Sequence, residues 1–117
     1  YQSYRSIVYK ISIEPNSLYA FKTLFNEFPQ PEEIKRIQLE FEFLRTLDHT
    51  NIIRAKDLIR HKNGFGLILE YFEGIPLIQY LNRINIDNFF PISIKIIDAL
   101  EHIHSKNIIH KDINPAN

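Results

Sequence analysis

The sequence contains no cysteine, no methionine and no tryptophan, and only three of its 117 residues are glycine. Without cysteine this segment can form neither disulfide bonds nor thiolate metal sites, which fits a cytoplasmic protein. Basic and acidic side chains balance at 14 each, so bulk charge gives no reason to expect a nucleic acid or a membrane surface as partner. No apolar run is long enough to cross a bilayer, and the first residues do not form a signal peptide.

The composition that is present is ordinary for a soluble globular domain, with 44% hydrophobic and 24% charged residues. A length of 117 residues suits one domain. The chain begins at Tyr1 instead of methionine and ends at Asn117 inside a polar motif. We therefore expect both ends to be cuts within a longer, multidomain chain.

Hydrophobic periodicity predicts a short series of strands and helices. Ile7, Tyr9 and Ile11 alternate with other residues as in a strand, whereas Ile34, Ile37 and their successors recur at helical spacing. Turn residues separate these segments, among them an Asn63-Gly64 pair that is typical of a hairpin. We expect strands over residues 6–13, 18–24, 52–61 and 65–71, and helices over residues 32–47 and 77–81 and from near Pro91 to Ser105.

This order predicts an α+β fold in which an antiparallel sheet with one helix precedes a mostly helical segment. Nothing in the sequence repeats at a fixed period, and no low-complexity linker interrupts it.

The residues most suited to chemistry are in the last octet, His-Lys-Asp-Ile-Asn-Pro-Ala-Asn. The Asp112 carboxylate could orient an attacking hydroxyl and accept its proton, and the Asn117 amide oxygen could hold a hard cation such as Mg²⁺. The alternative is a plain surface turn, because Asp, Asn and Pro are turn residues. Zinc binding by the nearby histidines is a weaker alternative, because their spacing matches no compact zinc motif.

Two further charged residues have an open interpretation. Lys22 follows Ala20 in an apolar strand, so its ammonium group must reach solvent or meet a carboxylate. Glu40 lies on the next helix, with Glu42 two residues further on. Each residue taken alone is most simply a solvent-exposed charge.

Taken in order, these features resemble the protein kinase superfamily. The succession is an Ala-x-Lys strand ending at Lys22, a helix carrying Glu40, a His-x-Asn-Ile segment from His49, a strand ending in Glu70-Tyr71, and the final octet. The resemblance covers essentially the whole chain, and the octet is its most specific part. It implies a kinase-like fold, with residues 1–72 forming the smaller lobe and residues 73–117 forming the start of the larger lobe.

The resemblance also implies a role for each matching residue. Lys22 would contact the phosphates of ATP and pair with Glu40, Asp112 would be the catalytic base, Asn117 would bind Mg²⁺, and His110 would be structural. The residues that would surround the purine are Val8, Ala20, Leu69, Glu70 and Phe72, with backbone groups of the segment from Glu70 to Phe72 bonding the adenine edge. The implied activity is ATP-dependent transfer of a phosphoryl group to serine or threonine hydroxyls on a protein. We expect this segment by itself to be inactive, because the second metal carboxylate would come after Asn117.

Five positions depart from the family pattern, and one of them is Lys111, which stands where the family has an arginine. The glycine-rich loop would place glycines at Tyr1, Ser3 and Ser6, and Asn114 stands where protein Ser/Thr kinases have a lysine. Glycines let backbone N–H groups approach phosphates closely, and a lysine there offsets transition-state charge. These departures keep open a pseudokinase that binds nucleotide or partners without catalysis. A small-molecule phosphotransferase of related fold, of the aminoglycoside or choline type, is a third alternative.

The departures from the glycine pattern, together with the octet, also resemble a narrower group. These are kinase-like domains that open very large bacterial signalling proteins, which also carry an ATPase module, a sensor domain and a histidine kinase. That resemblance implies a cytoplasmic signalling role for the parent protein.

Overall fold

The computed structural model describes residues 6–116, and its contacts divide the chain into two compact units. The first unit contains residues 6–48 and 53–71, and the second contains residues 49–52 and 72–116. The kinase-like α+β fold expected from the sequence is confirmed, with an antiparallel sheet and a helix followed by further helices.

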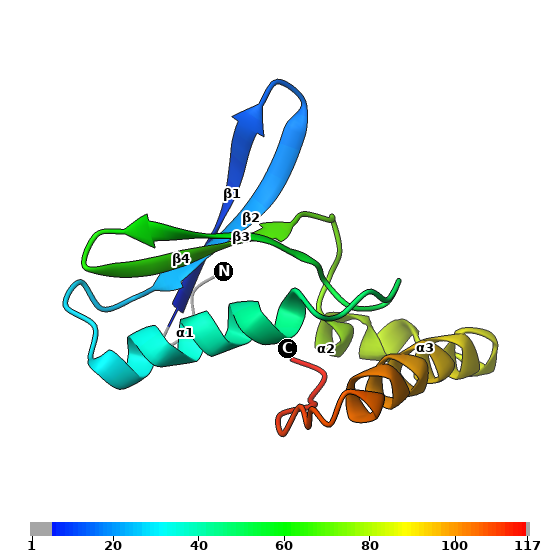
Figure 1. The fold of residues 1–117 in the computed structure, drawn as a ribbon. Helices are drawn as coiled ribbons and strands as arrows, with labels where there is room; N and C mark the ends of the chain where they lie inside the picture. Colours follow the sequence, from blue (N-terminus) through cyan, green and yellow to red (C-terminus); the bar gives the residue numbers. More distant parts are fainter. Residues whose placement is uncertain (1–5, 117) are drawn as a thin grey trace. The chain divides into compact units, whose positions relative to one another are not determined.

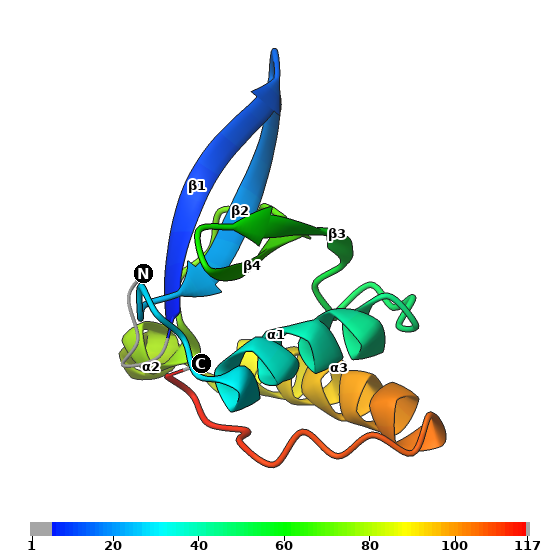
Figure 2. The same ribbon diagram turned by 60° about the vertical axis from the view of Figure 1, so that its left-hand side comes forward.

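The first unit is built on a four-stranded antiparallel sheet made from two hairpins (Figure 1). Its strands are β1 (Ser6–Glu14), β2 (Ser17–Leu24), β3 (Ala55–His61) and β4 (Gly64–Glu70), in the order β1-β2-β4-β3. The β1–β2 hairpin extends past the end of β4, as Figure 2 shows. The central strand β4 is buried on both faces, which explains its nearly continuous apolar sequence.

The two hairpin turns each use one residue with positive φ. Asn16 has φ of 66° between β1 and β2, and Lys62 has φ of 51° between β3 and β4. The second turn therefore consists of Lys62 and Asn63, and Gly64 already pairs with His61 in the sheet. The sequence placed this turn one residue too late, because asparagine and glycine are the residues that most readily accept positive φ.

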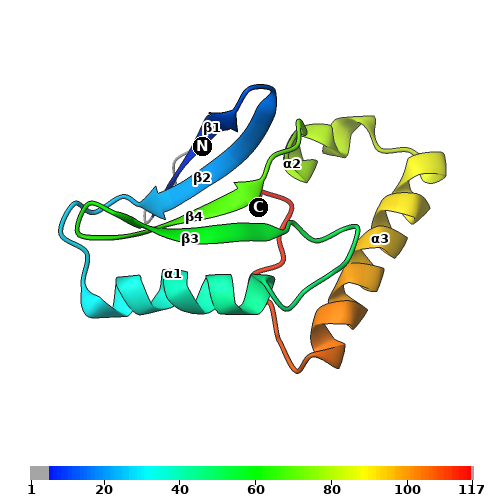
Figure 3. The same ribbon diagram turned by 45° about the horizontal axis from the view of Figure 1, so that its top comes forward.

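Helix α1 (Pro31–Leu44) lies along one face of the sheet under β3 and β4 (Figures 1 and 3). It begins with Pro31 at its first position, and the Gln30 N–H donates to the Glu33 side chain at 2.8 Å. Ile37, at 3% exposure, packs with Leu67 and Leu69 of β4 to form the core of this unit.

Two predicted boundaries are wrong for the same physical reason. The helix ends at Leu44 instead of residue 47, although Leu47 is buried in the turn that follows. The third strand begins at Ala55 instead of residue 52, although Ile53 packs against the core from the preceding loop. The spacing of apolar residues indicates which side chains are buried and does not show which backbone groups are hydrogen-bonded. These two residues pack inward from a turn and a loop, so the spacing placed them in a helix and a strand.

The second unit contains α2 (Leu77–Tyr80), a 3₁₀ turn η1 (Leu81–Arg83) and the long helix α3 (Ile86–Ser105). The Asn85 side chain caps α3 by accepting from the N–H groups of Asp87 and Asn88, so the helix begins five residues before Pro91. At its other end Asn107 has φ of 58°, and the N–H of Ile108 donates to the Ile103 oxygen. This left-handed residue stops the helix as a Schellman motif does.

No helix in the described part of the chain is both long and apolar enough to span a bilayer. Of the apolar residues along α3, Ile103 is buried, whereas Ile94 and Ile97 stay more than 60% exposed.

Gly66 offers a direct test of the sheet's outer face. A Cβ at Gly66 would overlap the Phe21 ring, which is buried between Tyr9 and His61. We expect Gly66→Ala to lower the free energy of unfolding by about 1–3 kcal/mol, the usual effect of overpacking a filled site. The measurement is denaturant unfolding of the protein.

The matched control is Gly74→Ala, where the added Cβ would lie 3.0 Å from the ring of Phe72, an exposed side chain that can move aside. It should change stability by no more than about 0.5 kcal/mol. Equal effects of the two substitutions would contradict the packing described for Phe21.

Candidate functional site

An ion pair between Lys22 of β2 and Glu40 of α1 is the central feature of the first unit. The Lys22 Nζ donates to both carboxylate oxygens of Glu40, at 2.7 and 2.8 Å. The side chains are 28% and 35% exposed, so the pair is partly shielded from solvent. The expected pairing is present, and the neighbouring Glu42 lies near Arg45 instead, at 3.6 Å.

The pair lies on a sheet face with other candidate residues. Opposite residues of an antiparallel pair project to the same face. Val8 is opposite Lys22, Lys22 is opposite Leu67, and Ala20 is opposite Leu69. Val8, Ala20, Lys22 and Leu69 therefore share one face of the sheet, the face on which α1 packs against β4. Lys10, opposite Ala20, projects to this face as well.

The end of β4 leads into the candidate adenine-binding segment. The N–H of Glu70 donates to the Arg54 oxygen at 3.0 Å, and a Glu70 carboxylate oxygen accepts from the Arg54 N–H at 2.8 Å. A ligand that contacts the Glu70 backbone would therefore use its carbonyl oxygen. Phe72, which is 65% exposed, belongs to the second unit.

The described part of the octet, residues 110–116, forms an exposed loop that turns back toward α2 within the second unit (Figures 2 and 3). Pro115 accepts a hydrogen bond from the Ile78 N–H at 2.7 Å, which ties the loop to α2. Lys111 has φ of 66°, an uncommon conformation for a lysine, and the Asp112 N–H donates to His110 Nδ1 at 3.3 Å. The ring of His110 thus holds the backbone beside Asp112, and Asn117 lies outside the described residues.

Asn114 is a contact of Asp112 that the sequence did not indicate. Its Nδ2 donates to Asp112 Oδ1 at 3.2 Å and to the Asp112 backbone oxygen at 3.4 Å. Its own Oδ1 accepts from the Ala116 N–H at 3.0 Å. The only available signal was the tendency of asparagine to bond nearby backbone groups.

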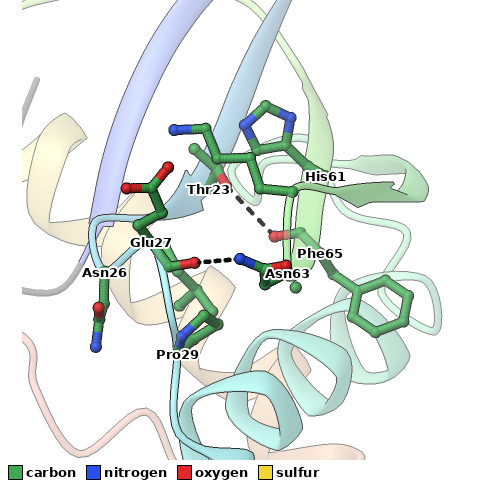
Figure 4. Close-up of a pocket in the computed structure, with 10 residues that line it drawn as sticks. Thr23, Asn26, Glu27, Pro29, His61, Asn63 and Phe65 are labelled. Carbon is green, nitrogen blue, oxygen red and sulfur yellow. Dashed lines mark hydrogen bonds between the residues drawn. The ribbon is translucent and has the colours of Figure 1, made fainter.

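A small pocket at one end of the sheet is separate from these residues (Figure 4). Thr23, which lines the pocket, projects to the other face of β2 from Lys22. The Asn63 Nδ2 donates to the Glu27 backbone oxygen across the pocket at 2.9 Å. Its volume of about 10 Å³ is at the lower limit for one water molecule. This pocket cannot hold a nucleotide.

A histidine cluster joins the segment before β3 to α3. Within the second unit, His49 Nδ1 accepts from the Asn51 N–H at 3.1 Å, so the ring proton is on Nε2, which lies 3.0 Å from Asp98. The ring of His102 lies against His49, with centroids 5.1 Å apart. Asp98 and His102 are four residues apart on α3, a spacing that already puts them on one helix face.

Among residues 6–116 there is no group of three or more histidine, cysteine, aspartate and glutamate side chains suited to a metal ion. Of the described candidates, Asp112 carries the carboxylate nearest in sequence to the predicted Mg²⁺ ligand Asn117.

A family model described as the protein kinase domain matches residues 4–117. The chain belongs to the protein kinase family. The serine/threonine-protein kinase PrkC of Bacillus subtilis is 30% identical over 102 residues, covering 84% of this chain and 16% of that protein. The serine/threonine-protein kinase ICK of Rattus norvegicus is 31% identical over 121 residues, covering 98% of this chain and 19% of that protein.

Solved kinase structures share the fold of this kinase domain segment. The PknI kinase domain of Mycobacterium tuberculosis, as a C20A mutant, matches 99% of the chain and 50% of its own with a TM-score of 0.79 at 24% identity. Rad53 1-466 in complex with AMP-PNP matches 99% of the chain and 31% of its own with a TM-score of 0.82 at 24% identity. The chain thus spans less than a fifth of these two curated relatives and at most half of these structures.

The His49 cluster can be tested by a double-mutant cycle. His49→Ala removes the partner of Asp98 and of the Asn51 N–H, so we expect it to lower the free energy of unfolding by about 1–2 kcal/mol. The coupling between His49→Ala and Asp98→Ala should be about 0.5–1 kcal/mol, because Asp98 is largely exposed. Denaturant unfolding measures both values.

The control is His104→Ala, because His104 is an exposed histidine on α3, the helix that carries Asp98. Additive effects of His49→Ala and Asp98→Ala, or an equal loss from His104→Ala, would argue against the cluster.

Proposed function

We propose that this chain is part of an ATP-dependent protein serine/threonine kinase that phosphorylates hydroxyl groups on proteins. The observation that carries the proposal is the bidentate Lys22–Glu40 pair on an apolar sheet face, in a chain of the protein kinase family. Relatives at about 30% identity are named serine/threonine-protein kinases. ATP, when bound, supplies the phosphoryl group.

The residues of the first unit suit a nucleotide. The Lys22 ammonium group offers one positive charge for phosphate oxygens, and Glu40 limits its position through two short hydrogen bonds. Val8, Ala20 and Leu69 add apolar surface on the same face for the purine ring. The Glu70 carbonyl and the Phe72 backbone serve the adenine edge in this proposal.

The residues of the octet suit the acceptor. Asp112 orients the protein hydroxyl and takes up its proton at a carboxylate oxygen. A bond then forms from the hydroxyl oxygen to the γ-phosphorus while the bond from that phosphorus to the bridging oxygen breaks, and ADP leaves. Asn117 holds Mg²⁺ through its amide oxygen in the same proposal. His110 acts on the backbone of Asp112 and moves no proton.

A pseudokinase is the second candidate, and Asn114 favours it. The neutral Asn114 amide takes the place of the family's lysine and brings no positive charge to the reacting phosphate. Tyr1, Ser3 and Ser6, at the positions of the glycine-rich loop, add to this case. A pseudokinase would bind nucleotide without transferring phosphate.

We further propose that the chain belongs to a large signalling protein that also carries an ATPase module, a sensor domain and a histidine kinase. The support is the resemblance of the octet and of the degenerate glycine positions to that group. The domain content of the intact protein decides the point, and absence of a histidine kinase module would refute it.

Nucleotide binding depends on Lys22 in this proposal. We expect Lys22→Met in the intact protein to weaken ATP binding about tenfold or more, because one charge contact to phosphate is lost. Glu40→Gln should weaken binding less, because it frees Lys22 without removing its charge. Isothermal titration with ATP and Mg²⁺ measures both affinities.

Lys56→Met is the matched control, because Lys56 is an exposed lysine on β3 whose ammonium lies 5.4 Å from the Tyr19 ring centroid. It should leave the affinity unchanged. An unchanged affinity for Lys22→Met would remove Lys22 from the nucleotide site.

Phosphoryl transfer depends on Asp112. We expect Asp112→Ala to lower kcat roughly a hundredfold or more, the usual contribution of a positioned general base. Transfer of the γ-phosphoryl group of ATP to a protein substrate by the intact protein measures this loss.

Equal phosphorylation by the native protein and Asp112→Ala would refute the role of Asp112. ATP binding by a native protein that transfers no phosphate would favour the pseudokinase.

A further inference from the structure

We propose that Asn114 is a positioning residue that holds the Asp112 carboxylate in its working orientation. The inference rests on the proposed kinase function and assigns the orientation of its base to a neutral amide. Asn114 takes the place of a lysine in the family pattern, so the family's charge-based role cannot apply to it.

Asn114 donates hydrogen bonds to Asp112 through its side-chain amide. The Asn114 amide nitrogen can only donate, and both of its contacts are oxygens of Asp112, at 3.2 Å to Oδ1 and 3.4 Å to the backbone. An ionised carboxylate accepts such a bond well, because bonds to charged acceptors are stronger than neutral ones. The amide therefore resists rotation of the carboxylate about χ2.

The Asn114 side chain is itself held in place by a hydrogen bond. Its Oδ1 accepts from the Ala116 N–H at 3.0 Å, which fixes which end of the amide faces Asp112. The next residue, Pro115, is tied to Ile78 at 2.7 Å. These hydrogen bonds thus connect the Asp112 carboxylate, through Asn114, to a backbone segment that is bonded to α2.

Packing does not account for the contact between Asn114 and Asp112. Asp112, Asn114 and their neighbours from Lys111 to Ala116 are exposed, so burial does not hold this loop in shape. In an exposed loop, local hydrogen bonds are the main restraint on a side chain, and a displacement of about 1 Å at a reacting group can cost about a hundredfold in rate. A device that orients Asp112 therefore affects turnover more than stability.

The amide also differs chemically from the lysine that it replaces. It donates a hydrogen bond to the carboxylate without placing a positive charge beside it. Asn114 can therefore orient the Asp112 carboxylate but cannot stabilise negative charge on the phosphate. That stabilisation must come from other groups. The expected phenotype is therefore a change in kcat and not in the KM for ATP.

The decisive variant is Asn114→Ser in the intact protein. A neutral serine hydroxyl can still accept from the Ala116 N–H, so it keeps the turn, but it lacks the amide N–H groups that donate to Asp112 and adds no charge beside it. If Asn114 only shapes the turn, Asn114→Ser keeps the native kcat. If Asn114 positions Asp112, kcat falls at least about tenfold, and Asn114→Ala also lowers it, with the KM for ATP within about twofold of native.

Two comparisons complete the experiment. Asn114→Ala should cause little further loss in an Asp112→Ala background, because residues that act through one another are not additive. Asn82→Ala, which truncates an exposed asparagine of η1, should leave kcat unchanged. Melting temperatures of all variants show whether any loss of rate reflects unfolding.

The outcomes separate this inference from the proposed function. Native kcat in Asn114→Ser, or equal losses from Asn114→Ala with and without Asp112, overturns the positioning role while the kinase function stands. A native protein without transferase activity, or an Asp112→Ala variant with the native rate, overturns both.

Discussion

The first unit depends on the packing of one helix residue against the central strand. Ile37 of α1 is buried against Leu67 and Leu69 of β4, and this contact sets the rotation of the helix about its axis. Glu40 is three residues after Ile37 and so lies on nearly the same side of the helix. Lys22 is opposite Leu67 in the sheet. The same apolar contact therefore brings the carboxylate and the ammonium group together.

This arrangement explains why a lysine is tolerated in an apolar strand. Burial of an unpaired charge is costly, and Glu40 offsets that cost with two hydrogen bonds. The pair keeps about a third of its surface exposed, so its energetic contribution to stability is modest. Its value in the proposed function is geometric, since it holds a positive charge at a defined place on the sheet face.

The second unit follows a different principle. α3 has capped ends and one buried residue, Ile103, whereas residues 110–116 after it are exposed and are held by hydrogen bonds that involve His110, Asn114 and Ile78. Each bond of this kind is worth only about 1 kcal/mol. The proposed acceptor site is therefore sensitive to single side chains in a way that the packed sheet is not.

The sequence by itself determined the order of strands and helices, the candidate residues and the α+β class, because periodicity and turn residues act locally. The strand around Lys22 left its ammonium group to reach solvent or meet a carboxylate, and the resemblance to protein kinases predicted the pairing with Glu40. Periodicity could not locate the ends of α1 and β3, because Leu47 and Ile53 are buried from turns and loops.

Only the tertiary structure decided which face of β2 carries Lys22 together with Val8, Ala20 and Leu69, because the register of β1 and β4 on β2 involves residues far apart in sequence. It also decided the partner of His49 and the contact between Asn114 and Asp112. Each of these side chains has several polar groups near it in sequence. Sequence spacing does not distinguish among these possible partners, because the backbone conformation decides which of them the side chain faces.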